Sequence, residues 1–216
     1  QRKDLFSSIL ILKKMIPRIE QKLELSKSDY LTLLKWLKDK DAQILYPERI
    51  ICSRYFDNVE YTMYRDTQEG IVPRKKIRIR TYNTNNFLES SNPYNLETKL
   101  TTEIRRYKSI DSEVDLNLFL KNGIYDKDYG MCFQLVDISY CREYFSIHGC
   151  RLTIDKDIKY HLVDSDNYFN SPVIIDPNYV VEIKADINTD LTLLLNQFEF
   201  PRSRFSKYER ALDSFL

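Results

Sequence analysis

The sequence is poor in residues that interrupt regular secondary structure. Its 216 residues include only 4 glycines and 7 prolines, and it contains no low-complexity tract or internal repeat. So few breaks predict a chain that is ordered nearly from end to end. The length suits one domain with its own hydrophobic core, and we assign residues 1–216 to a single domain.

Cysteine and histidine are too scarce and too scattered for a disulfide framework or a zinc site. The four cysteines, Cys52, Cys132, Cys141 and Cys150, form no CxxC pair. A chain of this size does not need disulfides, so a reducing cytoplasm is the expected location. The two histidines, at 148 and 161, are not clustered with cysteine, so we expect structural or surface roles for both.

The sequence also lacks a large charge excess and a long hydrophobic run. Lys+Arg 33 against Asp+Glu 32 argues against a polycation that coats nucleic acid. The most apolar segment, LFSSILILKKMI at residues 5–16, contains two lysines. It is shorter than the roughly 20 residues that cross a bilayer, and it lacks the basic start of a signal peptide. We expect no membrane span in this chain, although a membrane partner stays open.

What the sequence does contain is alternation of charged and apolar residues, interrupted at Gln21 in the first such segment, which in a β-strand places the two kinds on opposite faces. In KKIRIRTY, Lys76, Arg78 and Arg80 share one face, opposite Ile77 and Ile79. The same pattern occurs in RIEQKLEL (18–25), NLETKLT (95–101), RLTID (151–155) and VVEIKAD (180–186).

Helices are predicted between and after these strands from 3.6-residue apolar periodicity. Ser26 and Asp29 resemble a capping box that begins the first helix. Further helices are expected over residues 111–123, ending at Asn-Gly, over residues 188–198, and from a Ser206 and Glu209 cap to Leu216. The predicted fold class is α+β, with strands dominant.

The charged faces of the five strands need an explanation. A single such strand is usually part of an antiparallel sheet whose polar face meets water. Five strands that carry many cations and little Ser or Gln favour an antiparallel β tunnel barrel with a polar, cationic interior and helices outside. Clustered cations require carboxylates, water or a bound polyanion, and the fork of arginine fits phosphate. Glu20 and Glu182 suit magnesium or manganese, with simple charge balance as the alternative.

Eight short motifs resemble a known family. They are IEQK near the start, SRYFD (53–57), RKKIRIRTY (74–82), LETK (96–99), SYCREYF (139–145), RLTID (151–155), VVEIKAD (180–186) and SRFSKY (203–208). Their order is similar to that of the VTC domain, the polyphosphate polymerase branch of the triphosphate tunnel enzymes, which are relatives of the CYTH domain. The resemblance covers about residues 18–213. It implies a tunnel barrel that transfers the γ-phosphoryl group of ATP to growing inorganic polyphosphate with a divalent metal, preferably manganese.

The resemblance also implies the site residues. As catalytic residues it implies Lys22, Arg78, Arg80, Lys99, Arg142, Arg151 and Lys207. It implies substrate contacts for Tyr140, Arg204 and Ser206, to which the charged strand faces add Lys76 and Lys184. Glu182 matches the metal-binding glutamate, and Glu20 is assigned beside it as a metal ligand. Arg204 stands where the family often has lysine, and Glu24 where an apolar residue is common.

Other functions stay open at this stage. A tunnel triphosphatase would use the same scaffold, but that branch carries ExExK on its first strand, whereas this chain has Glu20, Lys22 and Glu24. A non-catalytic sensor of polyphosphate or nucleotide is a second alternative. RNA binding is disfavoured because the basic strands lack an aromatic stacking platform, so no nucleic-acid partner is expected. Phosphoryl transfer needs no Ser-His-Asp or Cys-His nucleophile, and the sequence shows neither.

Overall fold

The computed structural model describes residues 18–163, 171–186, 200 and 202–216. The described chain falls into two compact units. Unit 1 comprises the described parts of residues 1–47, 143–154 and 178–204, and unit 2 those of residues 48–142, 155–177 and 205–216. Antiparallel strands with accompanying helices form these units, so the predicted α+β class is confirmed. The single-domain assignment stays a prediction.

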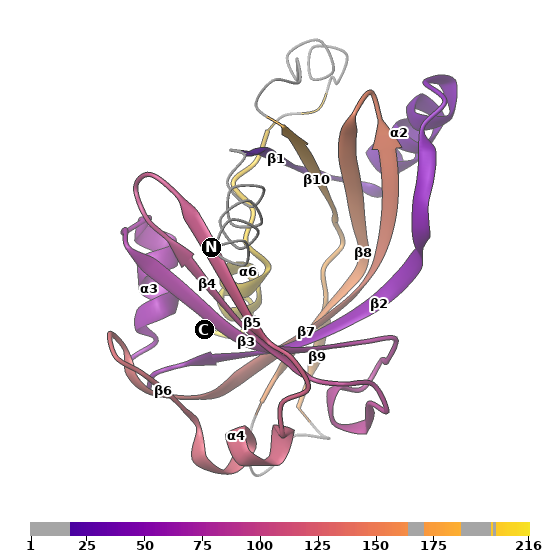
Figure 1. Ribbon diagram of the computed structural model, residues 1–216. Coiled ribbons are helices and arrows are strands. Elements are labelled where there is room, and N and C mark those ends of the chain that lie inside the picture. Colours follow the sequence, from indigo (N-terminus) through magenta and orange to yellow (C-terminus); the bar gives the residue numbers. More distant parts are fainter. Residues whose placement is uncertain (1–17, 164–170, 187–199, 201) are drawn as a thin grey trace, which may run out of the picture. The chain divides into compact units, whose positions relative to one another are not determined.

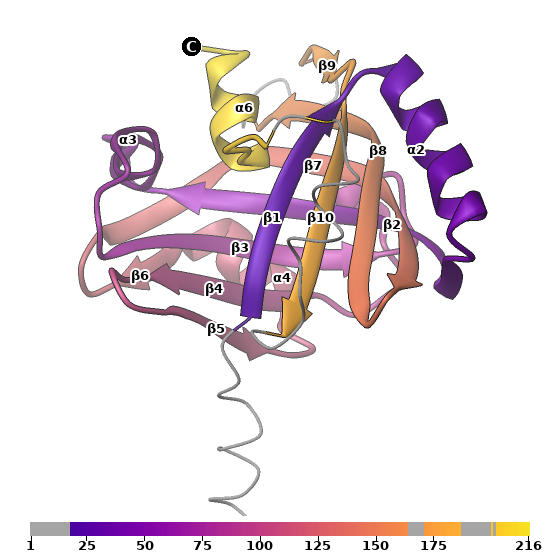
Figure 2. The same cartoon turned by 90° about the horizontal axis from the view of Figure 1, so that it is seen from above.

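Unit 1 is built around a pair of strands. β1 (Arg18–Leu25) pairs antiparallel with β10 (Tyr179–Asp186), and the two lie side by side in Figures 1 and 2. The unit also contains α2 (Lys27–Asp39), the start of β2 (Gln43–Asp57), the end of β7 (Gly130–Ile147) and the start of β8 (Cys150–Leu162). The pairing places Glu20 opposite Lys184 and Lys22 opposite Glu182.

The core of unit 1 lies on the apolar faces of these strands and is covered by α2. The helix begins at Ser26, whose side chain accepts from the Asp29 amide while Asp29 accepts from the Ser26 amide, as the capping box predicts. Leu33 and Leu37 of α2 are buried. They belong to one cluster with the following strand residues: Leu23, Leu25, Ile147, Leu152, Ile154, Val181 and Ile183.

Unit 2 contains the remaining strands and helices. β2 pairs with β3 (Arg74–Tyr82), β3 with β4 (Asn95–Thr101), and β4 with β5 (Arg106–Asp111), all antiparallel. β6 (Ile124–Asp126) pairs with β7, and β9 (Val173–Ile175) with β8. The helices are α3 (Thr62–Glu69), α4 (Leu116–Asn122) and α6 (Lys207–Asp213), and Phe87–Glu89 form a 3-10 turn. Figure 1 shows the β3–β4–β5 group.

The charged face of β3 is buried at its centre. Ile77 and Ile79 are buried on one face, as alternation predicts. On the other face, Arg78 is only 8% exposed and Arg80 only 6%. The solvated polar face that such a strand usually presents is therefore not what β3 forms. Two arginines inside the protein need partners, because an unpaired buried charge is strongly unfavourable.

The carboxylate of Asp57, at the end of β2, connects two helices. It accepts hydrogen bonds from the amides of Met63 and Tyr64 at the start of α3. It also accepts one from the hydroxyl of Tyr208 in α6, at 2.6 Å. The ring of Tyr208 stacks on Tyr55 of β2, with centroids 5.0 Å apart. The helix that begins after Ser206 is thereby held against β2.

The helix predicted over residues 111–123 is wrong before Leu116. Asp111 ends β5, and the side chain of Asp115 accepts from the Asn117 amide, which fixes the helix start there. The predicted stop is confirmed, because Gly123 caps the helix with φ +73°. A Cβ at that position would lie 2.7 Å from the carbonyl oxygen of Cys132, so only glycine fits.

The final helix begins where predicted but ends earlier. Ser206 accepts from the Glu209 amide as its N-cap, whereas the helix stops at Asp213 instead of Leu216. The amides of Ser214 and Phe215 bond to carbonyls three residues back, which tightens the last turn. The predicted helix over residues 188–198 and the apolar run 5–16 lie outside the described residues. None of the helices described is long and apolar enough to cross a membrane.

Truncating Leu33 should test the packing of α2. Leu33→Ala removes a fully buried side chain, so we expect the free energy of unfolding to fall by about 2–5 kcal/mol. Leu31→Ala in the same helix removes a side chain that is 58% exposed and should change it by less than about 0.5 kcal/mol. Urea denaturation followed by circular dichroism measures both. Equal losses in the two variants would contradict this packing.

Candidate functional site: two cation clusters and a charged strand pair

The first cluster, in unit 2, is organised by Glu97 of β4. Its carboxylate accepts hydrogen bonds from Nε (2.8 Å) and Nη2 of Arg78, and from the Lys108 ammonium at 2.7 Å. Nη1 of Arg80 lies 3.7 Å from the same carboxylate. The side chain of Glu97 is only 2% exposed. One negative charge therefore faces three cations, and the group keeps a net positive charge.

The pKa of the Glu97 carboxyl reflects both its burial and the three neighbouring cations. Burial by itself raises the pKa of the carboxyl, but Arg78, Arg80 and Lys108 outweigh burial and lower the pKa of Glu97 to about 2. The carboxylate is therefore ionised throughout the physiological range. Its structural effect is to hold two arginines in fixed positions inside the protein.

The two arginines keep part of their hydrogen-bonding capacity. Arg78 uses a third N–H on the hydroxyl of Tyr55 (2.7 Å). Arg80 donates to Ser53 Oγ (3.0 Å) and to the hydroxyl of Tyr140 (3.1 Å). A guanidinium has five N–H donors. On both Nη atoms of Arg78 one N–H has no hydrogen-bond partner among the described residues, and such a pair matches two phosphate oxygens.

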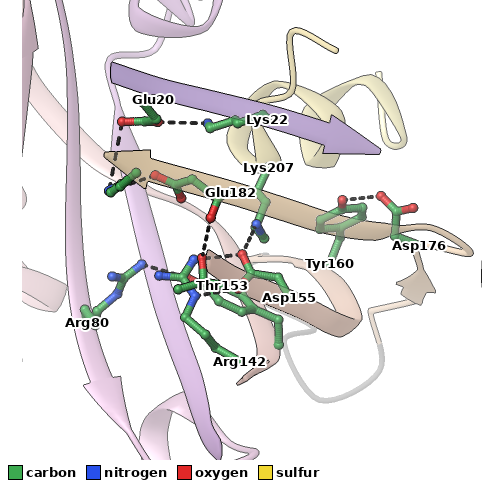
Figure 3. A network of polar contacts seen from close by, with 12 residues as sticks. Glu20, Lys22, Arg80, Arg142, Thr153, Asp155, Tyr160, Asp176, Glu182 and Lys207 are labelled. Carbon is green, nitrogen blue, oxygen red and sulfur yellow. Dashed lines mark hydrogen bonds and ion pairs between the residues drawn. The ribbon is translucent and has the colours of Figure 1, made fainter. Parts of the chain in front are cut away.

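The second cluster, also in unit 2, is organised by Asp155 of β8. Its carboxylate accepts from Nε and Nη2 of Arg142, the latter at 2.7 Å, and from the ammonium of Lys207 (Figure 3). Burial raises the pKa of Asp155, but Lys207 and Arg142 outweigh it and hold that pKa below its ordinary value. The Lys207 ammonium also lies 4.7 Å from the centre of the Tyr140 ring. Here two cations share one buried carboxylate.

The other predicted residues of unit 2 lie near these clusters or at the surface. Lys76 donates to the Oγ of Ser206 at 2.8 Å, which joins β3 to the start of α6. Lys99 is exposed, and across the sheet it pairs with Lys76 on one side and Lys108 on the other. Seven of the eight predicted residues in this unit therefore belong to the two clusters, contact them or contact each other, and Lys99 is the eighth. The seven are Arg78, Arg80, Tyr140, Arg142, Lys207, Lys76 and Ser206.

Unit 1 carries a strip of alternating charges on β1 and β10. Lys184 lies 2.7 Å from the Glu182 carboxylate and 3.9 Å from Glu20. Lys22 lies 3.9 Å from Glu20, and Figure 3 shows this contact along β1. Side-chain exposure is 14% at Glu182 and 33% at Lys22, so the strip is more open than the Glu97 cluster. The predicted residues Glu20, Lys22, Glu182 and Lys184 are thus brought together.

The remaining predicted residues of unit 1 are exposed. Arg151 lies with its guanidinium 5.9 Å from the centre of the Tyr144 ring. Arg204 is exposed as well. Glu24, which stands where the family commonly has an apolar residue, accepts a hydrogen bond from the side-chain amide of Asn178 at 2.7 Å.

The strip of unit 1 has the donors that a hard divalent ion prefers. Magnesium is commonly bound by one or two carboxylates together with substrate phosphates. Glu182 and Glu20 meet that requirement as two carboxylates that share Lys184 as a neighbour. Among the described residues no group of three or more His, Cys, Asp or Glu is placed to hold a metal ion. The carboxylates of Glu182 and Glu20 therefore suit a divalent ion whose other ligands are phosphate oxygens.

Sequence reasoning missed the two carboxylates at the centres of the clusters. Glu97 and Asp155 were placed on charged faces by alternation but received no role. The feature that could have indicated these roles is an acidic residue on a strand face that otherwise carries cations. In the sheet, Glu97 lies opposite Arg78. Tyr55 and Ser53, in the SRYFD motif, were also missed, although alternation places both on the face that pairs with Arg78 and Arg80.

Comparisons with known proteins agree with this picture. The model of the VTC domain matches residues 17–128 and 134–216, so the chain belongs to the VTC-domain family. No curated protein matches the sequence. A solved structure from Vibrio parahaemolyticus, titled "putative adenylate cyclase", is similar with a TM-score of 0.50 and 14% identity, over 91% of this chain and 97% of that one. At that identity the likeness concerns the fold alone.

Acid titration should expose the role of Glu97. Its folded-state pKa of about 2 lies below the ordinary 4.5, so its stabilisation is present above the unfolded value and is lost as pH falls toward the folded one. We expect the unfolding free energy of the wild type to fall between these values by on the order of 3 kcal/mol more than that of Glu97→Gln.

The matched control is Glu103→Gln, which changes an exposed glutamate in the same unit. This variant should follow the wild type at every pH. Denaturation curves across the acid range measure all three proteins. Parallel curves for Glu97→Gln and the wild type would show that the carboxylate does not hold the cations.

Proposed function

We propose that the chain is a polyphosphate polymerase that transfers the γ-phosphoryl group of ATP to a growing inorganic polyphosphate chain. The observation that carries this proposal is the Arg78–Arg80 pair, buried around Glu97 with N–H donors that no described residue uses. A preorganised, net positive group of this kind suits a polyanion of repeated phosphates. Membership of the VTC-domain family supports the choice of substrate.

In this proposal the chain's own residues bind and orient the phosphate groups of the triphosphate and of the acceptor. Phosphoryl transfer passes through a loose transition state whose charge is spread over the equatorial oxygens, so fixed cations stabilise it. Arg78 and Arg80, with Lys99 beside them, bind the triphosphate. Lys207 and Arg142, fixed by Asp155, bind phosphate oxygens of the acceptor. The attacking group is an ionised terminal phosphate oxygen, so no protein base is needed to remove a proton.

A divalent ion belongs to this proposal as well. Glu182, with Glu20, would hold manganese or magnesium in unit 1, and the ion would neutralise charge on phosphate oxygens. Lys184 would then exchange its contact with Glu182 for one with phosphate. Lys22, Arg151 and Arg204 supply further positive charge in the same unit.

A triphosphatase on this scaffold is the second candidate. It is disfavoured by the centre of β1, where Lys22 stands between two glutamates and pairs with Glu182 across the sheet. A sensor without turnover would bind triphosphate but release no product. We also propose a cytoplasmic reaction, supported by four free cysteines. The partners are then ATP and polyphosphate, without nucleic acid, and a membrane partner would be a separate protein.

The test is incubation of the purified protein with ATP and manganese, followed by polyphosphate gel electrophoresis beside a phosphate-release assay. Ladders of long chains are the expected result. Free phosphate without chains would identify a hydrolase. Triphosphate binding without either product would identify a sensor and overturn the proposed polymerase.

Lys99→Ala should slow chain synthesis without disturbing the fold. Lys99 is exposed, so its removal leaves no buried charge behind. Loss of one cation near phosphate should lower kcat/KM for ATP about 10-fold. Lys127→Ala, which removes an exposed lysine from the turn between β6 and β7, is the matched control and should keep wild-type kinetics. Unchanged kcat/KM in Lys99→Ala would remove this residue from the site.

Glu182→Gln should weaken manganese binding in the presence of tripolyphosphate. A neutral amide is a poorer ligand than a carboxylate for a hard cation, so we expect roughly a 10-fold or greater increase in the manganese Kd. Glu24→Gln changes a glutamate of β1 that contacts Asn178 and should leave that Kd unchanged. Water-proton relaxation or calorimetry measures binding without turnover. Equal affinities in Glu182→Gln and the wild type would exclude this metal ligand.

A further inference from the structure

Tyr55 combines deep burial with an unused hydrogen-bond donor. Its side chain lies on β2 opposite Arg78, and the residue is 7% exposed. The hydroxyl accepts a 2.7 Å hydrogen bond from Nη1 of Arg78. A phenol both accepts and donates, and no described residue accepts the proton of Tyr55. A buried hydroxyl normally has a partner for its proton.

The position of this hydroxyl is fixed from two sides. The ring of Tyr55 stacks on that of Tyr208 with centroids 5.0 Å apart and planes 17° apart. Tyr208 is in turn held by its hydrogen bond to Asp57. The ring cannot turn away without breaking the stack, so the hydroxyl stays beside the guanidinium of Arg78. The two N–H donors of Arg78 that lack described partners lie on the group that this hydroxyl touches.

We propose that Tyr55 is a phosphate-binding residue of the triphosphate site, donating its hydroxyl proton to a phosphate oxygen that Arg78 binds at the same time. This inference rests on the proposed function, and it adds a neutral donor beside the cations Arg78 and Arg80. The Arg78 hydrogen bond polarises the hydroxyl and makes it a better donor. Ser53, which accepts from Nε of Arg80 in the same way, offers a second such hydroxyl.

The charges around Tyr55 agree with a donor to an anion. Burial raises the pKa of the Tyr55 hydroxyl, but Arg78, Arg80 and Lys76 outweigh burial and lower it. The groups that face this hydroxyl are those three cations, the Glu97 carboxylate bound to Arg78, and the ring of Tyr208 with Asp57 behind it. Bound phosphate would add negative charge and accept the proton, so it would raise the Tyr55 pKa.

Tyr55→Phe removes the hydroxyl and keeps the stacked ring. A hydrogen bond to a charged group is worth enough that tripolyphosphate should bind about 10-fold to about 100-fold more weakly. Tyr64→Phe is the matched control, because Tyr64 packs edge-on to the same Tyr208 and its hydroxyl bonds to Asp213 instead. It should bind tripolyphosphate like the wild type. Isothermal titration calorimetry at neutral pH measures all three Kd values.

Tyrosinate absorbance gives a readout that a merely structural tyrosine would not move. At an alkaline pH that partly ionises Tyr55, adding tripolyphosphate to the wild type should lower the tyrosinate signal, because binding raises the pKa of Tyr55. The contribution of Tyr55 to this decrease should be absent in Tyr55→Phe. Should that variant fail to fold, the wild-type titration alone decides, since an unchanged tyrosinate signal on binding overturns the proposal.

The outcomes separate this inference from the proposed function. Equal tripolyphosphate affinity in Tyr55→Phe and the wild type overturns the role of Tyr55 and leaves the polymerase proposal standing. A wild-type protein that does not bind tripolyphosphate overturns both. Weaker binding in Tyr55→Phe, with Tyr64→Phe unchanged, supports the assignment.

Discussion

Like charges repel most strongly where water is excluded, and this chain buries Arg78 and Arg80 around a single carboxylate that also binds the more exposed Lys108. Glu97 makes that arrangement stable enough to fold, yet it cannot neutralise three cations. Asp155 repeats the same design with Arg142 and Lys207. In both clusters one buried anion fixes the geometry, and the remaining positive charge is left for a ligand.

This division of roles explains why the protein needs no conventional nucleophile. A phosphate chain brings its own reactive oxygens, and what it requires from the protein is alignment and compensation of charge. Side chains already held by Glu97 and Asp155 lose little conformational entropy when an anion arrives. The hydroxyls of Tyr55 and Tyr140, each bonded to one of the arginines, extend this set of fixed donors without adding charge.

Much of the fold could be predicted from the sequence, because alternation has a direct physical meaning. The strands at 18–25 and 95–101 were found with their observed bounds, and the capping box at Ser26 fixed the start of α2. The helix over 111–123 was overextended because periodicity does not reveal that Asp111 pairs with Leu96 in a sheet. The roles of Glu97 and Asp155 as the carboxylates that bind the clustered cations were not predicted, for a similar reason. A pattern along one strand assigns a face, whereas the partner of a side chain depends on neighbouring strands.

The carboxylate of Asp57 has a consequence for cooperativity. It accepts hydrogen bonds from the Met63 and Tyr64 amides in the first turn of α3 and from the hydroxyl of Tyr208, so two helices far apart in the sequence depend on one acceptor. If α6 detached, that buried acceptor would lose a donor and Tyr55 its stacked neighbour. Local opening of either helix therefore weakens the other, and both should exchange their amide hydrogens as one subglobal unit. The ammonium of Lys207, on the first turn of α6, stays in place only while that unit is closed.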